Sequence, residues 1–194
     1  MIIVSTAQDA VAMTLNAYAP ALVASLPPAM NSVTLIGPPL STASRVQREL
    51  QTSAKASLLF FGHGLNPPAL GFLAHDGNPA LDGKTISLLS GRVVCATCCH
   101  GNTVGALARR HAFSLLGYAG QFWVALHPQH ITDMEGAALA GPRAIMAGSA
   151  PVQAAPAVAR EYARLALTLH RRNISGDRAF ALFVSMNSSI VAAW

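Results

Sequence analysis

Charge is scarce in this sequence of 194 residues, of which only 11% are Asp, Glu, Lys or Arg. A typical globular protein carries about 25% of such residues. The net charge is a modest +5, and no basic run interleaved with aromatic residues occurs. This pattern argues against a nucleic-acid partner, because the phosphate backbone is bound by clustered lysine and arginine.

Long apolar runs are also missing, although 52% of the residues are apolar. Polar residues or proline interrupt every stretch before it reaches the roughly 18 apolar residues that a membrane-spanning helix needs. The first ten residues lack the basic flank and the long apolar segment of a secretory signal. We therefore expect no membrane partner and a cytoplasmic location.

Cysteine occurs only three times, at Cys95, Cys98 and Cys99. A disulfide framework spreads its cysteines along the chain, so this cluster excludes one. A zinc site built from these cysteines with His63 or His100 would have crowded ligands, and no second ligand pair stands at zinc-finger spacing. The sequence thus predicts neither a metal nor a cofactor.

What the sequence does contain is an alternation of short apolar strands and helical stretches. We predict strands at 2–5, 33–36, 57–61, 93–96 and 113–118, and helices at 9–25, 42–52, 102–111, around 158–169 and from 177 onwards. A loop with one hairpin is expected between them, over residues 65–84. The alternation predicts the α/β class, with a mostly parallel sheet and helices on both faces. No repeat or long polar linker divides the chain, so residues 1–194 are expected to form a single domain.

Two reactive clusters directly follow two of the predicted strands. His63 stands between two glycines after the strand at 57–61, and Cys98 and Cys99 follow the strand at 93–96. Loops at the carboxyl ends of neighbouring parallel strands converge at one edge of the sheet, where ligands bind. If these two strands are neighbours, the histidine meets the cysteines there.

A histidine side chain next to a cysteine side chain can activate the thiol. A cysteine attacks an amide as its thiolate, which a nearby imidazole and a helix amino terminus both favour, and Cys98 would have both. The N–H groups of Gly64 and Cys98 could point at the developing oxyanion. No acidic residue stands out as a third member, so we predict a dyad. Cys95 is expected to be a buried apolar residue of the strand.

At these residues the sequence resembles the caspase-like cysteine peptidases of the CHAT type. The similarity rests on two segments, LLFFGHG at 58–64 and VVCATCCHG at 93–101, and extends over roughly 32–126. It implies a caspase-like three-layer sandwich and a cysteine endopeptidase, with His63 and Cys98 as the catalytic pair. If the turn were one residue longer, Cys99 would be the nucleophile instead.

The resemblance also implies a protein or peptide substrate and a regulated bacterial protease, in a defence (including antiviral), stress or cell-death pathway. Regulation would come from a separate sensor protein, from a homodimer or from self-cleavage. The substrate pocket would be lined from the loop after the first strand, which holds Asp9, and from segments after the fifth, which hold Asp133 and Glu135. Asp9 in that pocket would select a basic side chain, whereas its competing role is to cap a helix.

Two other classes of function stay open on the sequence alone. Cys95 and Cys98 form a CxxC motif between a strand and a helix, which is also the setting of a thiol redox pair. That interpretation leaves His63 without a role. The second alternative is a non-catalytic scaffold with the caspase-like fold, since a fold does not guarantee activity.

Overall fold

The structure is a computed structural model that describes residues 1–26, 32–65, 69–172, 174 and 176–194. Its strands are β1 (Ile2–Ser5), β2 (Thr34–Ile36), β3 (Leu58–Phe61), β4 (Phe72–Leu73), β5 (Pro79–Leu81), β6 (Val93–Thr97), β7 (Ser114–Tyr118) and β8 (Val191–Ala193). Its helices are α1 (Ala10–Ala24), α2 (Ala43–Thr52), the 3₁₀ helix η1 (Ile86–Leu89), α3 (Gly101–Arg110), α4 (Pro128–Met146), α5 (Pro151–Arg172) and α6 (Asp177–Ile190).

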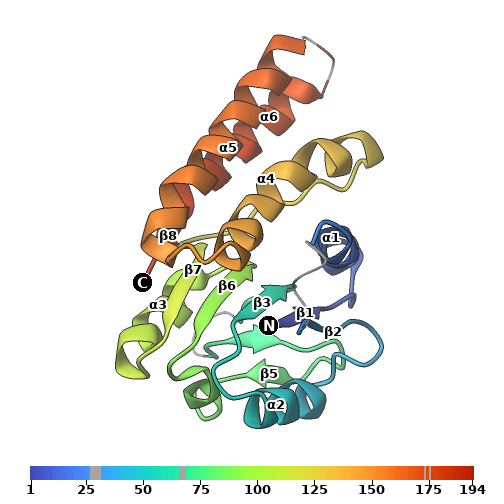
Figure 1. Cartoon of the computed structure of the whole chain (residues 1–194). Coiled ribbons are helices and arrows are strands. Elements are labelled where there is room, and N and C mark those ends of the chain that lie inside the picture. Colours follow the sequence, from blue (N-terminus) through green and yellow to red (C-terminus); the bar gives the residue numbers. More distant parts are fainter. Residues whose placement is uncertain (27–31, 66–68, 173, 175) are drawn as a thin grey trace.

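Six of the strands form one central sheet in the order β2-β1-β3-β6-β7-β8 (Figure 1). The first five in this order run parallel, and β8 is antiparallel to β7. The strands β4 and β5 pair separately as a short antiparallel hairpin. The chain therefore has the α/β class and the mostly parallel sheet that the sequence predicts.

Helices cover both faces of the sheet, and each face has its own apolar core. On one face, strand residues such as Ile3 and Leu59 pack against α1, α4, α5 and α6. On the other face, Ile2 and Leu58 pack against α2, the β4–β5 hairpin, η1 and α3. This alternation follows from the period of two in a strand, and it explains why the strands are apolar throughout. The arrangement is compatible with a three-layer sandwich.

A buried arginine ties together the ends of α2, η1 and β6. Arg92 is only 5% exposed, yet its guanidinium donates at 2.6–2.9 Å to the carbonyl oxygens of Leu50, Ser53, Ala56 and Leu88. Carbonyls at the end of a helix lack partners within the helix. The Arg92 side chain thus supplies hydrogen-bond donors to these carbonyl groups and holds the start of β6 against the ends of α2 and η1.

The sequence predictions for the strands at 2–5, 33–36, 57–61, 93–96 and 113–118 agree with β1, β2, β3, β6 and β7 to within a residue or so at their ends. The hairpin inside 65–84 is also confirmed where the structure describes that segment. Three elements were not predicted, η1, α4 and β8. The sequence of α4 contains Gly136, Gly141 and Pro142, which weaken the helical signal, and β8 follows α6 without a turn residue.

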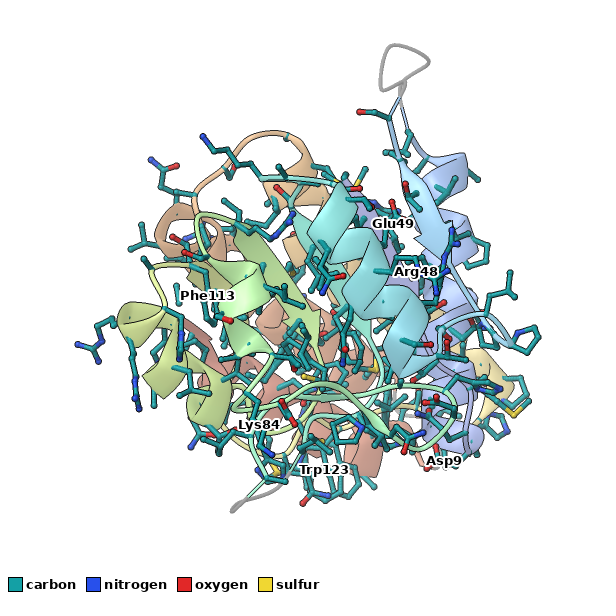
Figure 2. All side chains as sticks on the ribbon, turned by 90° about the horizontal axis from the view of Figure 1, so that it is seen from below. Asp9, Arg48, Glu49, Lys84, Phe113 and Trp123 are labelled. Atoms are coloured by element: carbon teal, nitrogen blue, oxygen red, sulfur yellow. The ribbon has the colours of Figure 1, made fainter. Side chains whose placement is uncertain are left out.

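The carboxyl edge of the parallel strands collects the loops that carry polar side chains. Figure 2 shows Asp9, which follows β1, and Trp123, which follows β7, along the lower edge of the view. Phe113, just before β7, and Arg48 and Glu49, in the second half of α2, lie higher in the same view. The lower edge is therefore the one at which a ligand of a parallel sheet is expected.

Candidate active site

The histidine motif lies directly against the cysteine turn. The strands β3 and β6 are neighbours, with Phe61 opposite Thr97, which confirms that the two reactive clusters share one edge of the sheet. At Gly64, a Cβ atom would lie 2.0 Å from the carbonyl oxygen of Cys99 and 3.3 Å from the Sγ atom of Cys98. Only a glycine lets the two loops approach this closely.

His63 has an acidic partner, Asp9. The His63 Nε2 atom lies 2.9 Å from the Asp9 Oδ2 atom, and the two side chains are 27% and 56% exposed. The contact arises because β1 pairs with β3, which places the loop after β1 beside the loop after β3. The sequence predicts Asp9 as a helix cap or a pocket residue but not its contact with His63, because the order of the strands in the sheet cannot be read from the sequence.

Asp9 also caps helix α1, as predicted. Its Oδ1 atom accepts a hydrogen bond of 2.9 Å from the N–H of Ala12. This backbone hydrogen bond, together with the bond and charge of His63, holds the pKa of the Asp9 carboxyl below its ordinary value, against a smaller opposing effect of burial. Asp9 is therefore a carboxylate at neutral pH, and both of its oxygens have partners.

The two cysteines of the turn differ in their surroundings. Cys98 is 1% exposed and belongs to the core on the α2 face, and burial raises the pKa of its thiol well above the ordinary value. Cys99 is half-buried, and its Sγ atom accepts a hydrogen bond of 3.3 Å from the N–H of Phe122. Burial also raises the pKa of the Cys99 thiol, while this hydrogen bond lowers it. Cys99 is thus the more reactive thiol in this conformation.

A cavity of about 380 Å³ opens beside His63. It is lined by Val11, His63, Gly64, Cys99, His100, Gln121 and Phe122. The loops after β3, β6 and β7 and the first turn of α1 each contribute a wall. His63, Gly64 and Cys99 thus share one cavity, whereas Cys98 lies behind it.

The turn that carries the cysteines has a specific backbone geometry. His100 adopts a left-handed conformation with φ of 59°, and its N–H donates to the carbonyl oxygen of Gly120 at 2.8 Å. This residue precedes α3 and lines the cavity with its neighbour Cys99. The strand β6 ends at Thr97, and the left-handed His100 turns the chain from the two cysteines into α3, which begins at Gly101.

The wall after β7 is held by side chains and not by strand pairing. The buried side chain of Asn187, on α6, accepts from the N–H of Trp123 at 2.9 Å and donates to its carbonyl oxygen at 2.8 Å. The Trp123 ring stacks on Phe183 at 4.5 Å between ring centroids. Helix α6 therefore positions this wall of the cavity, a role that sequence analysis missed, because nothing in the pattern links residues 64 positions apart.

The remaining predicted site residues lie elsewhere. Asp133, on α4, forms two hydrogen bonds of 2.6 and 2.7 Å with the guanidinium of Arg172. Neither Asp133 nor Glu135, which is half-buried on α4, is among the described residues that line the cavity. Their part in a substrate pocket stays a prediction.

Cys95 is a core residue, as predicted. It is 4% exposed and packs on the α4 face of the sheet, where burial raises the pKa of its thiol. Cys98 packs in the core of the opposite face. Both thiols are free, and their placement on opposite faces does not favour a redox pair, which needs two sulfurs within bonding distance and one of them accessible.

No protein-family model matches the chain, and no curated protein matches it.

Within the described residues, no helix has the length and apolar character needed to cross a membrane. No group of three or more His, Cys, Asp or Glu side chains in the same part of the chain is placed to hold a metal ion.

Proposed function

We propose that this protein is a cysteine endopeptidase of the caspase-like type, in which His63 is the base and the cysteine turn supplies the nucleophile. The observation that carries the proposal is the shared cavity, which His63 and Cys99 line from two adjacent loops. An imidazole within reach of a thiol is the arrangement that activates cysteine for attack on an amide. The α/β fold with its parallel sheet is compatible with this type of peptidase.

In the proposed reaction, His63 acts first as a general base and then as a general acid. It first takes the thiol proton as the sulfur forms a bond to the carbonyl carbon of the substrate, and it then gives that proton to the leaving amine as the C–N bond breaks. Water then attacks the thioester carbonyl carbon as His63 takes a proton from it, the C–S bond breaks to release the carboxylic acid product, and His63 returns the proton to the sulfur. The N–H groups of Gly64 and Cys98 are the proposed donors to the oxyanion of both tetrahedral intermediates.

The nucleophile is proposed to be Cys98, which the resemblance assigns, with Cys99 as the alternative. Cys98 must become accessible before it can react, because it is buried behind Gly64. Cys99 lines the cavity already. The two assignments share the same base and the same cavity, so both are peptidase mechanisms.

The substrate is proposed to be a protein or a peptide, and the enzyme to be a cytoplasmic bacterial protease of a defence, stress or cell-death pathway. A separate sensor protein or a second copy of the chain would regulate it. Burial of Cys98 in this conformation agrees with a low basal activity of the chain alone that a partner would raise. For regulation by a homodimer, we expect a rate per chain that rises with protein concentration, whereas a constant rate contradicts it.

The proposed function is tested by incubating the purified chain with a peptide library and identifying cleaved bonds by mass spectrometry. We expect cleavage by the wild-type protein and by Cys95→Ala, which is the matched control because its thiol lies in the opposite core. We expect at least a hundredfold loss in His63→Ala. Cleavage at equal rates in the wild type and His63→Ala, or none in either, contradicts the proposal.

A further inference from the structure

The carboxylate of Asp9 constrains which nitrogen of His63 carries a proton. Its Oδ2 atom lies 2.9 Å from the Nε2 atom of His63, and its Oδ1 atom is already bonded to the N–H of Ala12. A carboxylate can only accept hydrogen bonds, so the nitrogen that faces it must be the one with the hydrogen. The ring nitrogen that is left without a proton in the neutral imidazole is then Nδ1.

We propose that Asp9 is a positioning residue that holds His63 as the Nε2–H tautomer and leaves the Nδ1 atom to exchange the proton with the attacking thiol. The inference rests on the proposed function and deepens it, since it turns the predicted dyad into a set of three residues. Asp9 does not take up a proton in this scheme. It orients the ring and stabilises the imidazolium that forms.

The proton path follows from this assignment. Nδ1 accepts the proton of the thiol as the sulfur–carbon bond forms, and Nδ1–H donates it to the amine nitrogen as the carbon–nitrogen bond breaks. Nε2 keeps its hydrogen in both steps, and the Asp9 carboxylate keeps its charge. Among the described residues, Asp9 before α1 and Cys98, Cys99 and His100 in the turn before α3 are the ionisable groups that these contacts place around His63, and Asp9 is the carboxylate of this set.

The position of Asp9 at the start of α1 makes it rigid. The helix cap fixes the carboxylate, and the pairing of β1 with β3 fixes the backbone on both sides of the contact. Both oxygens of Asp9 have partners within the chain, so the structure assigns this carboxylate to the histidine in preference to a basic side chain of the substrate. A carboxylate held in this way can select one tautomer without any movement.

Three substitutions separate the charge of Asp9 from its role as a cap. Asp9→Asn keeps a good cap and a side chain of equal length, but it removes the charge and can donate as well as accept. Asp9→Ser keeps the cap with a side chain too short to reach His63. Asp9→Ala loses the cap and the contact. Equal thermal stability of the wild type and Asp9→Asn, measured by circular dichroism, shows that the fold is retained.

The direct readout is the ¹⁵N chemical shift of the two ring nitrogens of His63, measured by long-range ¹H–¹⁵N NMR at a pH at which the ring is neutral. We expect the Nε2–H tautomer in the wild type and a mixture of the two tautomers in Asp9→Asn and Asp9→Ser. The rate of peptide cleavage should fall about tenfold to a hundredfold in both variants. This loss lies at or below the lower end of the roughly hundredfold to ten-thousandfold range for acid–base groups, because Asp9 is 56% exposed and water screens its charge.

The outcomes separate the two proposals. An Nδ1–H tautomer in the wild type, or cleavage by Asp9→Asn and Asp9→Ser at the wild-type rate, overturns the role of Asp9 even when activity depends on His63. Cleavage that does not depend on His63 overturns the proposed function, whatever the tautomer. A rate that falls only for Arg and Lys substrates in Asp9→Asn, with the wild-type tautomer unchanged, assigns Asp9 to the substrate pocket and also overturns the inference.

Discussion

The close approach between the histidine loop and the cysteine turn can be tested by adding one methyl group. In Gly64→Ala, the new Cβ atom would lie 2.0 Å from the carbonyl oxygen of Cys99, which is backbone and cannot rotate away. Ordinary van der Waals contact begins at about 3.4 Å, so the loops must move apart by roughly 1 Å or more. Overpacking of this kind costs about 1–3 kcal/mol of the free energy of unfolding.

Gly64→Ala should also lose activity under conditions in which it is folded. A displacement of about 1 Å between catalytic groups reduces the rate about a hundredfold. We therefore expect Gly64→Ala to unfold at a lower urea concentration and to cleave peptides at about one hundredth of the wild-type rate. Both are measured on the same purified protein, by urea titration followed by circular dichroism and by peptide cleavage under conditions in which the variant is folded.

The matched control is Gly136→Ala, on the exposed side of α4. A Cβ atom at Gly136 would meet nothing within 4 Å, and alanine is the better helix former by about 1 kcal/mol. This variant should be as active as the wild type and slightly more stable. If Gly64→Ala were as stable and as active as the wild type, the contact between the histidine loop and the cysteine turn would not exist as described.

Three further predictions concern the surroundings of the site. Arg92→Met should lower the free energy of unfolding by about 3–5 kcal/mol, because four carbonyl groups lose a charged donor, and urea unfolding measures it; a loss below about 1 kcal/mol contradicts that role. Burial raises the pKa of the Cys95 and Cys98 thiols, so above the ordinary thiol pKa of about 8.5 the unfolded chain loses protons that the folded chain keeps. Stability should therefore fall by about 1.4 kcal/mol per pH unit for each thiol, and Cys95→Ala should show a smaller slope than the wild type in urea titrations at pH 8 to 10; equal slopes refute this account. Asn187→Leu removes the two hydrogen bonds from the Asn187 side chain to the Trp123 backbone, here called the Asn187 clamp, so the Trp123 amide should exchange its hydrogen faster. Unchanged exchange of this amide would show that the clamp does not hold the segment.

Sequence reasoning located the histidine and the cysteine turn because their signals are local. His63 and Cys98 each follow an apolar run that forms a strand of the parallel sheet. Glycine residues beside His63 indicate that its loop passes close to another part of the chain, which is the cysteine turn. The cap at Asp9 is likewise a local feature, and the structure confirms it. Residues whose role depends on one strand and the loop that follows it can be recognised from their neighbours in the chain.

The parts that were missed depend on contacts between distant segments. The contact of Asp9 with His63 requires β1 to pair with β3, and the Asn187 clamp requires α6 to lie against the segment after β7. The burial of Cys98 and the half-exposure of Cys99 depend on how the turn before α3 packs against the rest of the chain, and the left-handed residue of that turn, His100, is not a glycine. Such arrangements are set by packing, and a pattern of residue types does not show them.

The central claim is that His63 activates a thiol of the cysteine turn, and covalent trapping tests it most directly. The protein is treated with a peptide-derived, thiol-reactive trap, and the modified residue is mapped by mass spectrometry in the wild type, His63→Ala, Cys98→Ala and Cys99→Ala. We predict labelling at Cys98 that is lost in His63→Ala; His63-dependent labelling at Cys99 would move the nucleophile by one residue and keep the mechanism. Labelling that is equal in the wild type and His63→Ala, or that occurs at Cys95 as readily as in the turn, would contradict the account.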